Sequence, residues 1–318
     1  MPIIIVSVCL ICTVLFLCGC TIGFGGKTVY KFKGDETAYS IGDFSTGEAV
    51  CVVDIDWVRG DVIICPTTEN VFSVTEEASG EISEDYRLRY SFRDGVLSIK
   101  FCKSGFSVDP VLPQKTLIVN VPGWMKLDRL LSDCVSANVR ICRADIKTAD
   151  IETVSGEIRT SEHPDMYMYS SAPNFGSPRF EVYSAEINTV SGDVFLEETV
   201  ISFKRDLETV SGDISVSSWE ERWGGTNIET VSGDVDISFS QNGGDSFAID
   251  IETTSGDVKI TLPENASAQI EYDTVSGDFE CLRETTTVKK SGKKAIYTIG
   301  DGEQHIEVET VSGDLTVE

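Results

Sequence analysis

The chain has 318 residues, 41% of them hydrophobic, and its 52 acidic and 26 basic side chains give a formal net charge of −26. This hydrophobic content excludes a mainly disordered protein, and the length suffices for one large domain or two ordinary ones. The charge excludes a basic surface that would neutralise phosphate backbones or anionic lipid. We therefore expect no nucleic-acid partner and no electrostatic docking on a membrane.

The first predicted element is an N-terminal targeting segment. Residues 1–20, MPIIIVSVCLICTVLFLCGC, contain no charged side chain, which is typical of a signal peptide or a membrane helix. The end of this segment, Leu17-Cys18-Gly19-Cys20, resembles a bacterial lipobox, in which the cysteine after a small residue is acylated and becomes the new N-terminus. The resemblance implies lipidation at Cys20. The alternative is an uncleaved helical anchor, because lysines follow the apolar run and none precedes it.

Two stretches between residues 88 and 122 alternate apolar and polar side chains. LRYSFRDGVLSIKF from Leu88 and KTLIVNVP from Lys115 predict strands, with turns at Asp94-Gly95 and Pro122-Gly123. The stretch EEASGEIS from Glu76 lacks flanking apolar alternation and predicts a loop.

The main feature of the sequence is a repeated string, IETVSGDVDI at residues 228–237, which occurs in seven close copies. The serines that align the copies are Ser155, Ser191, Ser211, Ser232, Ser255, Ser276 and Ser312. Most copies are spaced by 20 to 23 residues, and two steps are 36 residues long. Fainter copies, DCVSANVRI from Asp133 and IDWVRGDVII from Ile55, predict that the array begins near residue 55.

Each 36-residue step predicts one unit with an inserted outward loop. The first insert covers residues 161–178 and the second residues 283–295. Functional sites on repeat proteins often lie on such inserts. The aromatic residues Tyr167, Tyr169 and Phe175 of the first insert are therefore candidate partner-binding residues, with a loop folded over the coil edge as the alternative.

Within a unit, apolar and polar side chains alternate on both sides of the Ser-Gly pair, which indicates two short strands. The inward positions are even before the pair and odd after it, so Val231-Ser232-Gly233 is expected to form a corner. Glycine suits a corner by adopting positive φ or by allowing a close backbone approach, and serine can bond local turn amides.

A period of about 21 residues with short strands predicts a single-stranded parallel β-helix, or β-solenoid, with coils of about 20–23 residues. We expect right-handed winding, with each coil pairing only with the coils before and after it in the sequence. The predicted organisation is an anchor over residues 1–20, a tether and cap over 21–50, and one solenoid domain over 51–318.

Two ladders of polar side chains follow from stacking. One consists of the acids after each Ser-Gly pair: Glu157, Asp193, Asp213, Asp234, Asp257, Asp278 and Asp314. We expect solvated carboxylates that cap turn amides. Calcium binding is the less favoured alternative, because the units lack the nonapeptide of calcium-binding β-rolls. The other ladder is Thr153, Thr189, Thr209, Thr230, Thr253, Thr274 and Thr310, for which corner filling is favoured over binding of ice or sugar.

Nothing in the sequence indicates catalysis, a cofactor or a metal centre. The two histidines, His163 and His305, have no nucleophile motif around them, and P-loop, G-x-S-x-G and H-E-x-x-H strings are absent. Outside the targeting segment six cysteines remain, with no C-x-x-C or Cys/His cluster for zinc: Cys51, Cys65, Cys102, Cys134, Cys142 and Cys281. They are expected as buried thiols or as disulfides of unassigned connectivity.

The repeated Thr-Val-Ser-Gly-Asp-Val strings, with a closing IEVETVSGDLTV from Ile306, resemble the bacterial putative-adhesin family over roughly Val53 to the C-terminus. The resemblance implies a parallel β-helix outside the cytoplasm and transfers no catalytic residues. We predict a non-enzymatic, lipid-anchored protein of the bacterial cell surface that binds an extracytoplasmic protein or glycan. Alternatives are an envelope-stress sensing or scaffolding module, and a polysaccharide-degrading β-helix enzyme with a non-repeating groove of acidic and basic residues.

Overall fold

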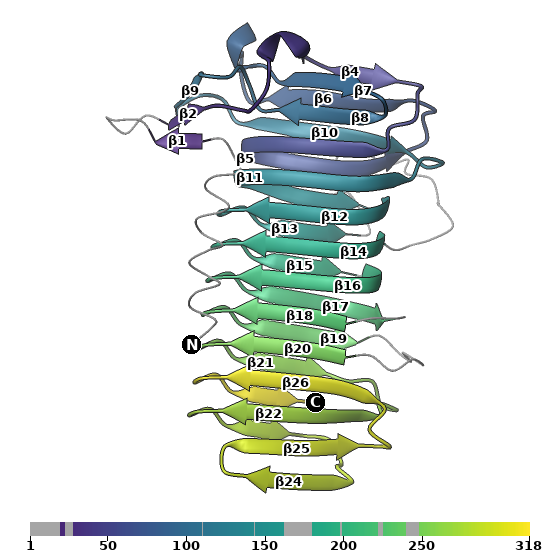
Figure 1. Cartoon of the computed structure of the whole chain (residues 1–318), viewed down its shortest axis with the longest axis vertical. Coiled ribbons are helices and arrows are strands. Elements are labelled where there is room, and N and C mark those ends of the chain that lie inside the picture. Colours follow the sequence, from purple (N-terminus) through teal and green to yellow (C-terminus); the bar gives the residue numbers. More distant parts are fainter. Residues whose placement is uncertain are drawn as a thin grey trace.

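The computed structural model describes residues 20–22, 28–109, 111–142, 144–161, 180–197, 199–221, 225–239 and 248–318. In this part of the chain, strands dominate and the helices are two short 3-10 turns, η1 (Glu36–Ala38) and η2 (Glu84–Tyr86). A three-stranded sheet contains β1 (Cys20–Ile22), β2 (Thr28–Tyr30) and β9 (Ser107–Val108), and the other 24 strands form one continuous sheet wound into a tall column (Figure 1). The predicted all-β solenoid is confirmed.

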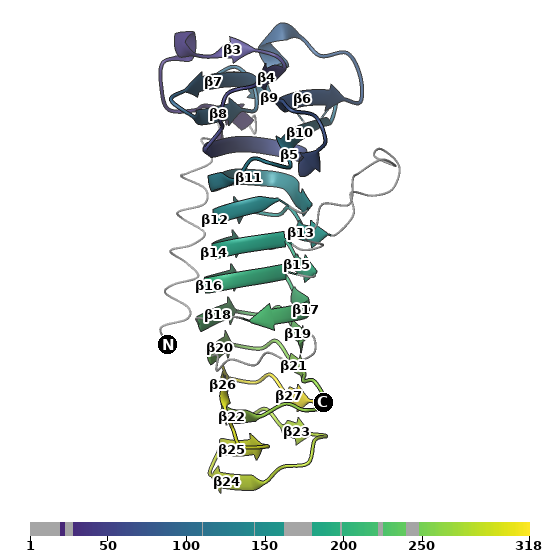
Figure 2. The ribbon, with the colours of Figure 1, turned by 90° about the vertical axis from the view of Figure 1, so that its right-hand side faces the viewer.

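Two stacks of parallel strands form the walls of the column (Figure 2). In spatial order, the first stack contains β12 (Asp145–Thr153), β14 (Phe180–Thr189), β16 (Thr199–Thr209), β18 (Gly225–Thr230), β20 (Ala248–Thr253), β26 (Gln304–Thr310) and β22 (Ala268–Thr274). The second contains β13 (Ile158–Ser161), β15 (Val194–Glu197), β17 (Ile214–Glu221), β19 (Val235–Phe239), β21 (Val258–Thr261), β27 (Leu315–Val317) and β23 (Phe279–Cys281). Each coil therefore supplies one strand to each wall.

The core lies between the two walls and is filled by side chains in register. From the first stack it takes Ile151, Ile187, Leu207, Ile228, Ile251, Val308 and Tyr272, all buried. From the second it takes Ile158, Val194, Ile214, Val235, Val258 and Leu315, also buried. Burying one such side chain stabilises the fold by about 1.5–3 kcal/mol, and only stacked neighbours exclude water from it.

The array begins where the faint copies predict. The two long strands β5 (Val52–Thr67) and β11 (Leu127–Cys142) pair in parallel, with Ala137 opposite Gly60 and Asn138 opposite Asp61. β11 then pairs with both β12 and β13, so it forms the coil that starts the regular stacks.

The coil order at the C-terminal end differs from the sequence order. β26 pairs in parallel with β20 on one side and with β22 on the other, and β27 lies likewise between β21 and β23. The last repeat of the chain is thus inserted between the two repeats that precede it. The prediction that each coil pairs only with its sequence neighbours is wrong here, because the repeats are so alike that register alone does not fix their order.

The second insert is also different from the expected loop. Residues 287–299 form a β-hairpin, β24 (Thr287–Ser291) and β25 (Lys294–Ile299), which pairs antiparallel with β22 and covers the end of the column. The rings of Tyr272, Phe279 and Tyr297 of β25 close the core, with successive centroids 5.6 and 4.1 Å apart. The exposed Lys289 and Lys290 on the outer strand oppose edge-to-edge association.

An antiparallel cap closes the other end (Figures 1 and 2). It contains β3 (Ser40–Ile41), β4 (Phe44–Thr46), β6 (Phe72–Ala78), β7 (Arg89–Arg93), β8 (Val96–Lys100) and β10 (Lys115–Pro122). The predicted strands from Leu88 and Lys115 are confirmed, with a turn at Asp94-Gly95 where both residues have positive φ. The predicted loop from Glu76 is partly wrong, because β6 continues to Ala78 and pairs with β10 before the loop begins.

In the described part of the chain, neither helix has the length and apolar character that a membrane span requires.

Candidate binding face

The Ser-Gly corner is a point of close contact between coils. A Cβ built on Gly233 would lie 1.9 Å from the carbonyl oxygen of Gly212 in the neighbouring coil, and the other repeat glycines show the same approach. None of the seven repeat glycines has positive φ. Of the two expected reasons for glycine, close backbone approach is therefore the one that applies.

The threonines of the repeat point into the column. All seven are buried, and the Oγ1 of Thr230 accepts a hydrogen bond from the amide of Gly233 at 3.0 Å, as its equivalents do in the other coils. This geometry confirms the corner-filling role. The buried hydroxyls form no surface for ice or sugar.

The serines and acids of the corner tie each coil to the next. Ser232 Oγ donates a hydrogen bond to the carbonyl of Val210 in the adjacent coil at 3.3 Å, whereas a hydrogen bond with a local turn amide was expected. The exposed carboxylate of Asp213 accepts from the amide of Asp234 at 2.9 Å, and Asp234 accepts in turn from Asp257. The solvated, amide-capping role predicted for this ladder is confirmed.

The outer surface of the first stack carries two more columns of acidic side chains, which we call the acidic face. One column is Asp150, Glu186, Asp206, Asn227, Asp250, Glu307 and Glu271. The other is Glu152, Asn188, Glu208, Glu229, Glu252, Glu309 and Asp273. Each column thus holds six carboxylates and one amide. The alternation of the repeat contains this face, but sequence reasoning treated these positions only as outward strand residues.

Like charges accumulate on the acidic face. At a strand spacing of about 4.8 Å, two neighbouring carboxylates repel each other by about 0.9 kcal/mol in water. Partial burial raises the pKa of Glu208, and the carboxylates of Glu229 and Glu186 raise it further. Basic partners lie near its ends and one edge: Arg129 contacts Asp150 at 3.1 Å, and Lys204 and Lys294 pair with Asp206 and Glu271. The face therefore favours a partner that brings positive charge.

A hollow of about 690 Å³ lies along the edge of the acidic face where strands β18 and β20 begin. It is formed where the small residues Gly225 and Ala248 lie between Lys204 and His305. Its other polar lining residues are Arg205, Asp206, Thr226, Asn227, Asp250 and Glu307. His305 Nε2 lies 3.9 Å from a carboxylate oxygen of Glu307. The hollow offers donors and acceptors at the side of the acidic face.

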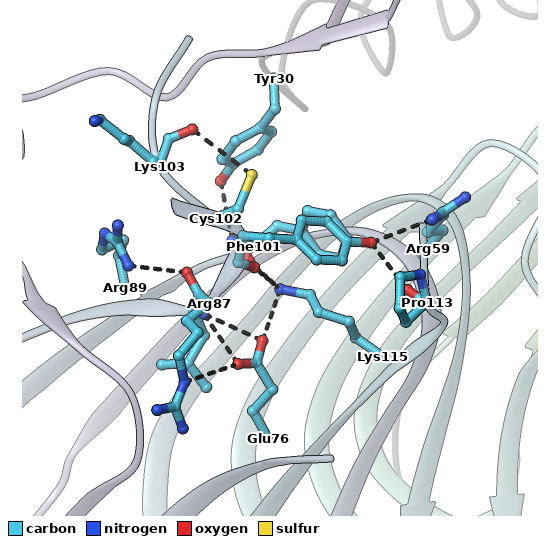
Figure 3. Close-up of polar contacts among 12 residues, drawn as sticks. Tyr30, Arg59, Glu76, Arg87, Arg89, Phe101, Cys102, Lys103, Pro113 and Lys115 are labelled. Atoms are coloured by element: carbon cyan, nitrogen blue, oxygen red, sulfur yellow. Dashed lines mark hydrogen bonds and ion pairs between the residues drawn. The ribbon is translucent and has the colours of Figure 1, made fainter. Parts of the chain in front are cut away.

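A second polar cluster is buried inside the cap (Figure 3). Lys115 Nζ lies 2.6 Å from Glu76 Oε1, with both side chains wholly inaccessible, and also donates to the carbonyls of Tyr86 and Phe101. The rings of Trp57, Tyr86 and Phe101 surround the ammonium group at 4.7, 4.6 and 4.0 Å from their centroids. Burial lowers the pKa of Lys115 to about 8, and Glu76 opposes that shift.

The ammonium of Lys115 has three acceptors for its three hydrogens, so this cluster stabilises the cap and leaves no donor for a ligand. Sequence reasoning missed it, because a lysine before an apolar run resembles an exposed strand end.

The other predicted site residues are placed as follows. Tyr167, Tyr169, Phe175 and His163 lie outside the described residues. Cys20 is the first residue of β1, which pairs antiparallel with β2 beside the cap. Across the ranges that the structure describes, no group of three or more His, Cys, Asp or Glu side chains is arranged to hold a metal ion.

The fold and its stacked corners define a parallel β-solenoid protein. The chain belongs to the Toastrack DUF4097 family, whose model matches residues 52–318, the span over which the sequence resemblance was found. It is similar to a structure described as a putative cell adhesion protein from Clostridium sporogenes, with 11% identity over 87% of this chain and 99% of that chain and a TM-score of 0.26. A putative adhesin from Parabacteroides distasonis is 10% identical over 88% of this chain and 97% of that chain, with a TM-score of 0.41. No curated protein matches the chain.

Proposed function

We propose that this chain is a non-enzymatic lipoprotein of the bacterial cell surface whose solenoid binds an extracytoplasmic protein or glycan along the acidic face. The observation that carries the proposal is the register of the two acidic columns, which places at least one carboxylate on the outer surface of each of seven coils. A repeating, rigid surface suits a partner that is itself extended, and its charge selects positively charged groups.

The placement of Cys20 supports the anchoring part of the proposal. β1 lies beside the cap, whereas the hairpin β24–β25 closes the opposite end of the column (Figure 1). A lipid on Cys20 would hold the cap end near the membrane and direct the coils away from it. The mass of the N-terminal tryptic peptide tests this step: an acylated peptide that begins at Cys20 is expected, and an unmodified N-terminus at Met1 would contradict it.

Binding is tested with a lysine-rich peptide as the probe of the acidic face. We expect affinity that falls steeply with salt, because exposed charges are screened within about 8–10 Å at physiological ionic strength. A variant with Glu208→Gln, Glu229→Gln and Glu252→Gln should bind several-fold more weakly. The matched control removes three exposed charges elsewhere, by Asp236→Asn, Glu280→Gln and Glu284→Gln, and should bind like the parent chain.

Equal weakening in both variants would mean that net charge alone drives the interaction, which contradicts a specific face. The chain could instead capture a neutral envelope glycan with an affinity that neither salt nor either variant changes. That result would show that binding occurs on a surface other than the acidic face.

A further inference from the structure

Two buried cysteines meet at the junction between the first two coils. Ile64 of β5 pairs with Ile141 of β11, so the next step of this parallel register places Cys65 beside Cys142. Their thiols share a hydrogen bond, and each side chain is only 3% exposed. Both side chains point to the same side of the sheet, because register partners in a parallel pair do so.

The spacing of these strands suits a disulfide. Register partners on neighbouring strands have Cα atoms about 4.8 Å apart, and disulfides join Cα atoms about 4.4–6.8 Å apart. Three other cysteines have different contacts: Cys102 and Cys281 donate to carbonyl oxygens, and the thiol of Cys134 contacts the hydroxyl of Ser132. Among the cysteines that the structure describes, Cys65 and Cys142 are the two whose thiols contact each other.

We propose that Cys65 and Cys142 form a redox-controlled disulfide that fastens the first coil to the second. The oxidant is a protein or small-molecule disulfide of the thiol-exchange class. When local opening of this junction exposes one of the two cysteines to solvent, its thiolate attacks the disulfide of the oxidant and forms a mixed disulfide. The other thiolate then displaces the reduced oxidant, so that two S–H bonds are lost, one S–S bond forms, and the disulfide of the oxidant becomes two thiols.

The position of the pair gives the bond a structural consequence. β5 and β11 lie side by side in the column, yet residues 66–141 separate the two cysteines in the sequence and include the cap strands β6, β7, β8 and β10 (Figure 1). A bond here would close the segment that contains most of the cap. Cross-linking so long a segment restricts the unfolded chain strongly, so oxidation should stabilise the cap and reduction should loosen it. Extracytoplasmic compartments maintain such bonds, in keeping with the proposed location.

Peptide mapping tests the bond directly. The full chain is treated with oxidised glutathione under native conditions, its remaining thiols are alkylated, and it is digested with trypsin. We expect residues 60–87 joined to residues 141–143, lighter by two hydrogen atoms than the sum of the separate peptides. Recovery of both peptides alkylated and separate would overturn the proposal and leave the pair as buried thiols. Linkage found only after denaturation would overturn it as well.

Thermal unfolding distinguishes a stabilising disulfide between Cys65 and Cys142 from non-specific oxidation of other cysteines. The melting temperature of the parent chain should rise by several degrees on oxidation and return on reduction. The variant Cys65→Ser/Cys142→Ser should show no redox shift, whereas the control Cys134→Ser, which alters another buried cysteine, should keep it. A redox shift that survives in the double variant would contradict the assignment. None of these results depends on partner binding, so they stand apart from the proposed function.

Discussion

The amide of Asp314 donates to Oδ1 of Asp257 at 2.9 Å, although the two residues are 57 positions apart in the sequence. The amide of Asp278 donates in turn to Oδ1 of Asp314 at 2.7 Å. The ladder therefore runs from Asp257 through Asp314 to Asp278, and the last repeat of the chain completes the stack between two earlier ones. Final folding of this end must await the C-terminal residues.

Deletion of residues 304–318 should therefore unfold more than the segment removed. Without β26 and β27, β20 and β21 lose one neighbour, and β22 and β23 lose their parallel partner. We expect hydrogen exchange to accelerate in both 248–261 and 268–281. Faster exchange confined to 268–281 would support stacking in sequence order instead.

Gly233→Ala should destabilise the column through the corner contact. The new methyl group would lie 1.9 Å from the carbonyl oxygen of Gly212, so two coils must separate. Overpacking of this kind costs about 1–3 kcal/mol or more, measured as the free energy of unfolding in urea. In the control Gly225→Ala, the nearest atom is 3.9 Å away, and unfolding should change by less than about 1 kcal/mol. Equal effects of the two changes would contradict the close approach.

Asp56→Asn should change how stability depends on pH. Burial raises the pKa of Asp56 to about 7, while Lys100 and the hydroxyl of Tyr30 oppose the shift. The folded chain thus binds this proton more tightly than the unfolded chain, and the resulting stabilisation is complete below about pH 4 and lost as pH rises through 7. Relative to the variant, the parent chain should lose up to about 4 kcal/mol between pH 4 and pH 8. The free energy of unfolding in urea is measured at each pH for the parent chain and the variant, and an identical pH dependence in both would argue against a buried carboxyl group. The variant Asp236→Asn, at an exposed position, serves as the control.

The buried pair Lys115 and Glu76 should be strongly coupled. Lys115→Met or Glu76→Gln alone disrupts the pairing inside the cap, at a cost of about 3–5 kcal/mol when a charge is left unpaired. The double variant should lose much less than the sum of the two. A double-mutant cycle of unfolding free energies measures this coupling, and additive losses would show that the two side chains act independently.

Much of the column could be predicted from the repeat because period-two alternation and a recurring Ser-Gly corner report local geometry. The walls, the buried threonines and the capping acids follow from residues such as Thr230, Gly233 and Asp234. The faint copies near Ile55 and Asp133 fix the start of the array, because their register positions keep small side chains at the corner.

The rest depends on contacts between distant segments. Nothing local distinguishes the repeat at Val308 from the repeat at Tyr272 as the partner of β20, so the interleaved order could not be predicted. The hairpin at 287–299 resembles a polar loop, because its first half is rich in lysine and its strand β25 is positioned by pairing with the distant β22. The contact between Cys65 and Cys142 likewise arises from the pairing of β5 with β11, across the whole cap.

Distances between spin labels at the exposed corner serines measure most directly whether the coils lie in register in one column. Labels at Ser191 and Ser312, and separately at Ser191 and Ser276, would be placed in a chain whose half-exposed Cys51 and Cys281 are changed to serine. With about 4.8 Å per coil, stacking in this order predicts separations of about 19 Å from Ser191 to Ser312 and about 24 Å from Ser191 to Ser276. A longer distance to Ser312 than to Ser276, or broad distributions without defined maxima, would contradict it.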